Sequence, residues 1–289
     1  MHRLFLAAVA AALLGISLGS AGAATTPAGA SAVRSAAAYP TAMVVLGADT
    51  AAGFGADASH PFSEAKANSW AGGANPAVKS VYSRLVGRAP ALRGHVVNLA
   101  GHDDAGQELD DLARQVRSAV ALRRKPELAV IQVLERSIKC DGTETDFGAY
   151  GAKFAAALDA LAAGLPNAKI FVVGQWGSLA SYVRALRSLP LNVQLKHAGK
   201  KPCQLVDATA ARVTPQRIAY VSRIVAGRQA QLKAACARIA RCRYDGGTVG
   251  RVALSAADVS EWQWTPSASG QAKIAAAAWT AMAAWVGRG

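Results

Sequence analysis

The sequence predicts an α/β fold, a three-layer α/β/α sandwich built around a parallel, flavodoxin-like sheet. Two observations carry this prediction. Short and nearly continuous apolar runs, rich in Val and Ile, alternate along the chain with longer segments of helical periodicity. Strands that are apolar on both sides are typical of parallel sheets with both faces covered. Right-handed crossovers between consecutive strands then give the doubly wound arrangement.

Each strand is expected at one of the apolar runs, namely residues 42–47, 95–100, 127–134, 168–176 and 249–255. Helices are expected between and after them, at residues 76–88, 106–122, 146–165, 215–240 and 268–286. Pro76 suits the first turn of the first helix. Asp146 is placed to cap the third helix, and Ser178 to cap a further one after the fourth strand.

The N-terminal residues predict export from the cell. Arg3 precedes an apolar run at residues 4–18, and residues 21–23 form an A-x-A cleavage site, so residues 1–23 have the layout of a secretory signal peptide. Residues 24–38 have the composition of a flexible linker. Residues 39–289 are long enough for one large domain. We therefore expect a secreted, extracellular protein without a membrane span in its mature form.

The chain is strongly basic, with a formal net charge of +14. Its Lys and Arg residues are scattered, and no basic stripe is interleaved with aromatic residues. Specific nucleic-acid binding is therefore not expected. The charge is read as that of a basic exported protein; attraction to an anionic surface is the alternative.

Four cysteines predict two disulfides in an exported chain. They are Cys140, Cys203, Cys236 and Cys242, which allow three pairings. The pair Cys236–Cys242 is favoured because the two residues are close in sequence at a helix end, and it leaves Cys140–Cys203 as the second pair. None of the spacings is CxxC, so no zinc site is expected. No cofactor is predicted.

The functional residues are expected at the carboxyl ends of the strands, where this architecture binds ligands. The loops that begin at Asp49, Gly101, Glu135 and Trp176 should converge there. A long loop at residues 53–75, rich in Gly, Ala and Ser, borders the same edge, and its length suits a binding role.

Four segments, in their order along the chain, resemble the SGNH (GDSL) hydrolases, a family of secreted esterases and lipases. They are residues 46–56 (LGADTAAGFGA), 98–105 (NLAGHDDA), 130–140 (VIQVLERSIKC) and 264–275 (WTPSASGQAKIA). Residues 67–85 are also similar to a segment of exported, actinobacterial-type members. The resemblance spans nearly all of residues 39–289 and implies the SGNH hydrolase fold. It also implies ester hydrolysis by a Ser–His–Asp triad.

The nucleophile position of this family is altered in the chain. Gly47 matches the Gly of the G-D-S motif, but Ala48 stands for its Asp and Asp49 for the nucleophilic Ser. A carboxylate cannot be activated as a Ser hydroxyl is, and it would repel a developing oxyanion. The resemblance therefore implies that serine chemistry is lost at Asp49.

The other positions of the family's site are altered too. The oxyanion-hole Gly falls at or next to Asp103, and the oxyanion-hole Asn falls at Arg136, or at residue 137 if the register shifts by one. Trp262 stands for the triad's Asp and Thr265 for its His. The last of the chain's five histidines is His197, so no shift of register can place a His before the final helix. The sequence therefore predicts a degenerate catalytic site.

Three interpretations of the polar edge remain open: an ion-paired rim, a binding site and a different kind of hydrolase. The first pairs Arg136 with Asp49 or Asp103. The second binds a polar small molecule, a glycan or an acylated cell-wall component through carboxylates beside indole faces. The third uses paired carboxylates, or a metal held by Asp49, His102 and Asp103, although one His among carboxylates is a weak metal signal. The residues concerned are Asp49, His102, Asp103, Asp104, Glu135, Arg136, Trp262 and Trp264.

We interpret the chain as a secreted SGNH-fold protein that lacks the triad and acts as a non-catalytic binding or structural protein. The alternative is an active secreted esterase or lipase-like hydrolase with a relocated triad. Asp258 and Glu261 lie near enough in sequence to act at the site, but they have no His partner at the family's spacing. The sequence specifies no oligomeric state.

Overall fold

A computed structural model of the chain describes residues 39–102, 107–134, 138, 145–196, 215–261 and 265–288. All of these residues belong to one compact unit, Ala36–Gly289. The predicted signal peptide and linker, residues 1–38, lie outside the described part of the chain.

Five parallel strands form the sheet at the centre of this unit. They are β1 (Met43–Gly47), β2 (Val96–Asn98), β3 (Leu128–Gln132), β4 (Lys169–Val173) and β5 (Cys242–Tyr244), in the order β2-β1-β3-β4-β5. Gly47 pairs with Gln132, so β1 and β3 end level with each other at the carboxyl edge. This strand order is that of the flavodoxin-like sheet, and it confirms the predicted fold class.

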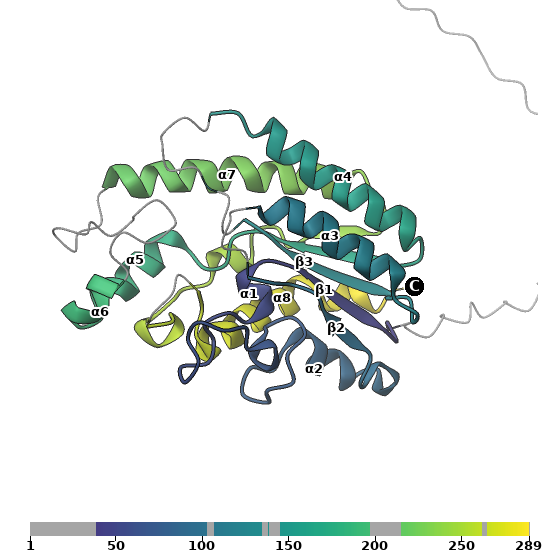
Figure 1. The fold of residues 1–289 in the computed structure, drawn as a ribbon, viewed down its shortest axis with the longest axis horizontal. Coiled ribbons are helices and arrows are strands. Elements are labelled where there is room, and N and C mark those ends of the chain that lie inside the picture. Colours follow the sequence, from purple (N-terminus) through teal and green to yellow (C-terminus); the bar gives the residue numbers. More distant parts are fainter. Residues whose placement is uncertain are drawn as a thin grey trace, which may run out of the picture. The chain divides into compact units, whose positions relative to one another are not determined.

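Helices cover both faces of the sheet, which makes three layers (Figure 1). One face carries α3 (Glu108–Ala121), α4 (Gly148–Gly164) and α7 (Pro215–Ala237); the other carries α2 (Val81–Val86) and α8 (Ala268–Val286). Alternate residues of a strand point to opposite faces. Val44 and Leu46 of β1 accordingly pack toward α3 and α4, whereas Met43 and Val45 pack toward α2 and α8.

Shorter elements complete the described fold. Three are α-helices: α1 (Asp49–Ala52), α5 (Leu179–Arg187) and α6 (Leu191–Lys196). Four are 3₁₀ turns: η1 (Lys66–Asn68), η2 (Pro90–Leu92), η3 (Val249–Arg251) and η4 (Ala256–Asp258). No described helix combines the length with the apolar composition that crossing a bilayer requires.

The prediction of a strand at residues 249–255 is wrong. Residues 249–251 form η3 instead, and the fifth strand is β5. The backbone N–H of Val249 donates to the carboxylate of Asp245 at 2.8 Å, and the Val249 carbonyl accepts the N–H of Gly177 at 3.0 Å. These groups are therefore used in loop contacts, not in a strand ladder. The true strand has no apolar signal because it lies at the edge of the sheet and none of its residues is buried.

The helix predicted at residues 76–88 is shorter than expected. It begins at Val81 because the Ser80 hydroxyl caps it, accepting the N–H of Ser83 at 3.1 Å. Pro76 does not start the helix: it lies in a turn in which the Asn75 side chain accepts the N–H of Ala77 at 2.9 Å. An Asn side chain that bonds its backbone two residues on favours such a turn over a helix.

The two predicted caps differ in outcome. The Ser178 hydroxyl accepts the N–H of Ser181 at 3.3 Å, which confirms it as the cap of α5. Asp146 is not the N-cap of α4, because that position is Phe147. Its carboxylate does accept the N–H of Gly148, at 2.7 Å, so it still satisfies one donor at the start of the helix.

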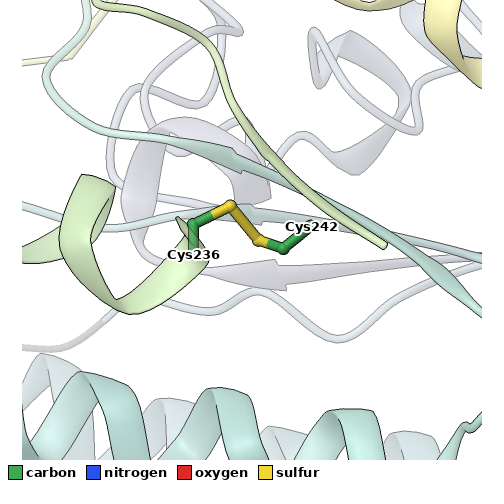
Figure 2. Close-up of a disulfide and its surroundings, with 2 residues drawn as sticks. All are labelled: Cys236 and Cys242. Carbon is green, nitrogen blue, oxygen red and sulfur yellow. A yellow bond between two sulfur atoms is a disulfide. The ribbon is translucent and has the colours of Figure 1, made fainter. Parts of the chain in front are cut away.

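The predicted disulfide between Cys236 and Cys242 is confirmed (Figure 2). Cys236 lies in the last turn of α7 and Cys242 begins β5, with 5.3 Å between their Cα atoms. The bridge therefore fixes the turn from the longest described helix into the edge strand. Cys140 and Cys203 lie outside the described residues.

Candidate functional site

A rigid turn at the end of β1 places residue 49 at the carboxyl edge. Gly47 has a φ of +122°, and a Cβ added there would lie 1.8 Å from the carbonyl oxygen of Gln132. The Gln115 side chain of α3 accepts the Gly47 N–H at 2.6 Å and donates to the Gly47 carbonyl at 3.0 Å. The Ala48 N–H donates to the Gln132 carbonyl at 3.0 Å. Only glycine fits at this crossing, and the next residues are held by neighbours on both sides.

Asp49 and His102 form a buried pair at this edge. Asp49 opens α1 and is only 2% exposed. Its Oδ1 atom lies 2.9 Å from Nδ1 of His102, which comes from the loop after β2. The His102 side chain is 19% exposed, so the imidazole forms the outer half of the pair. The structure thus brings together two of the residues that the sequence predicted at one site.

Two residues that sequence reasoning missed hold His102 in place. The ring of Phe54 stacks on the imidazole with 3.7 Å between ring centroids and 4° between planes. Glu64 accepts the backbone N–H of His102 at 2.8 Å. Both residues belong to the 53–75 loop, and an isolated bridge pairs them. The only sequence feature that pointed to Phe54 and Glu64 was the length of the loop. The loop has no apolar periodicity that would single out individual positions.

The long loop is itself anchored to the core at its far end. Trp70 is fully buried, and its backbone N–H donates to the Gln271 side chain of α8 at 2.9 Å. The same Gln271 side chain donates to the Thr50 carbonyl at 3.0 Å. The indole N–H of Trp70 donates to the Gln132 side chain at 3.3 Å. The loop, α1 and α8 are therefore joined directly behind Asp49.

Thr265, which stands for the family's His, is buried just before α8. It is 2% exposed, and its carbonyl accepts the N–H of Ser260 at 2.9 Å. Its hydroxyl is buried and has no hydrogen-bond partner among the described residues. A threonine hydroxyl cannot act as the general base that an imidazole provides. Thr265 is therefore part of the buried packing before α8 and is unsuited to proton transfer.

Asp258 has a structural role in which both oxygens of its carboxylate accept hydrogen bonds. It accepts bonds from the Ser255 hydroxyl at 2.6 Å, the Ser269 hydroxyl at 2.7 Å and the Lys273 ammonium at 2.6 Å. Burial raises the pKa of Asp258, but these bonds outweigh it, and the net pKa lies below the usual value. The carboxylate is therefore ionised and committed to joining η4 to α8. Glu261 forms an exposed ion pair with Lys196.

The remaining predicted site residues lie outside the described part of the chain. They are Asp103, Asp104, Glu135, Arg136, Trp262 and Trp264. Within the described ranges, no three His, Cys, Asp or Glu side chains gather as a metal site requires. Asp103, the third ligand of the metal hypothesis, lies outside these described ranges.

A cavity of about 470 Å³ opens between the 53–75 loop and the segment that leads into α8, and neither Asp49 nor His102 is among its described lining residues. It begins at Gly55, directly after the residue that stacks on His102. Its polar lining comes from the carboxylates of Asp57 and Glu261 with the side chains of Asn68, Ser260 and Ser269, and the remainder is small or apolar. Hydrogen-bonding groups set among small apolar ones are typical of sites for polar small molecules.

The comparisons with known proteins add little to this geometry. The sequence matches no protein-family model and no curated protein. Among solved structures, the chain is similar to a carbohydrate esterase family 2 enzyme with a carbohydrate-binding domain from Corynascus thermopiles (Myceliophthora fergusii). The identity is 14%, the TM-score is 0.46, and the match covers 89% of this chain and 69% of the other. A similarity at this level carries no argument about function.

Proposed function

We propose that the chain is a secreted protein with an SGNH-like scaffold that binds a polar, glycan-like ligand at the carboxyl edge and performs no serine-dependent catalysis. The observation that carries this proposal is the buried carboxylate of Asp49 at the end of β1, paired with His102 at 2.9 Å. A carboxylate is no substitute for an activated hydroxyl, and it opposes negative charge that develops in an acyl-transfer transition state.

The adjoining cavity gives the ligand its expected chemistry. A volume of about 470 Å³ admits a small saccharide, and the described lining offers carboxylate, amide and hydroxyl groups. Such groups accept and donate to ligand hydroxyls, while Val259, Pro61 and the alanines face the C–H surfaces of a sugar ring. The described lining includes two carboxylates and no cationic side chain, so an anionic ligand is disfavoured here and neutral saccharides are the first ligands to test.

Calorimetric titration with neutral cell-wall oligosaccharides, with and without acyl groups, tests the proposal. We expect at least one binder whose affinity falls in Asp49→Ala or Trp262→Ala. Ala58→Trp, which fills the cavity from its rim, should weaken the same binder by at least tenfold. Ala121→Trp, an exposed alanine at the end of α3, is the matched control and should leave affinity unchanged. A binding affinity that stays unchanged in Asp49→Ala, Trp262→Ala and Ala58→Trp would overturn the proposal.

A second candidate function rests on the same pair. Asp49 holds Nδ1 of His102, which is the arrangement that orients an imidazole as a general base. In that case His102 would take a proton from water, the water oxygen would attack an ester carbonyl, and the proton would pass to the departing alcohol. Turnover of short nitrophenyl esters that disappears in His102→Ala would favour this function. The binding proposal predicts no turnover above a heat-denatured control.

A further inference from the structure

Two further cavities lie at the same edge of the sheet, beyond the ends of β4 and β5. The charge of their lining residues differs from that of the first cavity. The two cavities have volumes of about 430 and 480 Å³. Both are lined by Ala226 and Gln229 of α7 and by Gly250 and Arg251 of the η3 turn, so the two cavities adjoin each other along α7. We call the pair the α7 groove.

The α7 groove is long enough for a chain molecule. Its α7 wall extends from Val221 to Lys233, on residues that recur at the three- and four-residue spacing of one helix face. Twelve steps of helical rise correspond to about 18 Å. That length is just over three helical turns, and it exceeds what a single sugar ring would occupy.

The charge of the described lining is entirely positive. Arg251 lines both cavities and Lys233 lines one, and no Asp or Glu is among the described lining residues. The Arg251 guanidinium is fixed in the wall because it donates to the Gly246 carbonyl at 2.9 Å and to the Thr248 hydroxyl at 3.3 Å. Glycine at 247 permits this, since a Cβ there would lie 3.2 Å from the guanidinium. Lys233 is exposed at the other end.

Neutral polar groups between the two cations suit a ligand rich in hydroxyls. The Tyr244 hydroxyl donates to the Gln229 side-chain oxygen at 2.8 Å, which orients the amide. Burial, followed by the charge of Asp245, raises the pKa of Tyr244, so this hydroxyl remains a donor. The Asp245 carboxylate is buried, accepts the N–H groups of Gly247 and Val249, and is not among the described lining residues, although its charge acts on Arg251.

We propose that the α7 groove binds an extended anionic glycan, whose acidic groups pair with Arg251 and Lys233 and whose hydroxyls meet the polar groups between them. A nucleic acid fits less well, because Tyr244 is the only aromatic residue in the described lining and single-stranded nucleic acids rely on stacking. The net charge of +14 adds long-range attraction to a polyanion. This site is separate from the cavity lined by Asp57 and Glu261 and goes beyond the proposed function.

Titration of the full chain with three probes of similar length tests this proposal: hexagalacturonate, an oligomer of ribitol phosphate, and maltohexaose. We expect one or both anionic probes to bind and maltohexaose not to bind. The stronger anionic probe identifies the acidic group as carboxylate or phosphate. Equal affinity for maltohexaose, or no binding of either anionic probe up to millimolar concentration, would overturn the proposal. So would tighter binding of a hexameric oligonucleotide.

Substitutions separate the groove from the overall charge. Lys233→Gln and Arg251→Gln should each weaken the anionic probe at least fivefold. Arg123→Gln removes the same charge from an exposed position before β3 and is the matched control, expected within twofold of the unaltered protein. Equal weakening by all three would mean that only net charge matters, and the proposal would fail.

A variant that blocks the α7 groove by size tests the proposal even if Arg251→Gln disturbs the η3 turn. Ala226 is exposed on α7 and lines both cavities, so Ala226→Trp fills the groove without changing the charge. It should abolish binding of the anionic probe with an unchanged circular-dichroism spectrum. Asp49→Ala should leave this binding intact, so failure here and failure of the proposed function are distinguishable. Retained binding in Ala226→Trp would contradict the proposal.

Discussion

At the scale of single residues, the position of Asp49 depends on Gly47. The backbone of residue 47 lies against Gln132 so closely that any side chain at residue 47 would collide with the neighbouring strand. The sequence showed that a glycine was there, through its likeness to a known motif, but not why it is required. The reason lies in the level ends of β1 and β3, which only pairing across the sheet reveals.

Gly47→Ala should therefore prevent normal folding or cost about 3 kcal/mol or more, because backbone atoms must move to relieve the collision. Gly246→Ala is the matched control. Gly246 also has a positive φ, +68°, but nothing lies within 4 Å of a Cβ there. The control should cost about 1–2 kcal/mol, the expense of the left-handed conformation alone. Urea denaturation measures both, and equal costs would show that the contact with Gln132 is unimportant.

A second prediction at this scale concerns Asp258. Its pKa is lowered in the folded protein, because bonds from Lys273, Ser255 and Ser269 outweigh the effect of burial. The unfolded chain therefore binds the proton more readily. The stability that this carboxylate contributes is present above the ordinary Asp pKa and is lost as pH falls through the folded value. Acid should consequently weaken the joint between η4 and α8.

Asp258→Asn should lower the free energy of unfolding by about 2 kcal/mol at pH 7, through loss of charged hydrogen bonds. The difference from the unaltered protein should shrink as the pH falls from 5 to 3. Asp159→Asn is the control, since Asp159 pairs with Arg238 in an exposed bridge at 2.8 Å, where a loss below about 1 kcal/mol is expected. A pH-independent loss in Asp258→Asn would contradict the role assigned to its charge.

Among the elements, four of the five strands could be predicted from the sequence, including the edge strand β2 within residues 95–100, whereas the edge strand β5 could not. The strands β1, β3 and β4 are apolar and almost wholly buried, so their patterns were clear. The edge strand β5 has three residues, Cys242, Arg243 and Tyr244, and none of them is buried, so it has no apolar pattern. The apolar residues that follow it at 249–255 predict a strand where the structure has the η3 turn. The other edge strand, β2, could be recognised because it contains two valines.

The disulfide is the feature of β5 that the sequence did indicate. Its loop is short, with a sequence separation of 6, so loop closure predicts a modest stabilisation. Replacing both Cys236 and Cys242 by Ala should lower the free energy of unfolding by about 2 kcal/mol. Non-reducing peptide mapping should recover this bridge, together with a second one between Cys140 and Cys203. Free thiols at all four positions in natively secreted protein would show that the pairing is wrong.

At the scale of the whole molecule, the alternation of strands and helices was sufficient to predict the three layers and the flavodoxin-like fold class. The same reasoning located the edge where Asp49 meets His102, because the carboxyl ends of parallel strands coincide. It could not find Phe54 and Glu64, which reach His102 through a loop without periodicity. Nor could it find the α7 groove, whose charge depends on a turn that was assigned to a strand.

The central claim is that the edge formed around Asp49 has lost serine chemistry while the scaffold is kept. The most direct test is incubation of the purified mature protein with a fluorophosphonate probe, followed by intact-mass measurement, with an active serine esterase as a positive control. We predict no increase in mass, because the resemblance places a carboxylate at the nucleophile position and no His lies between His197 and α8. Stoichiometric labelling that maps to any Ser would contradict the account, since it would reveal an activated hydroxyl elsewhere in the chain.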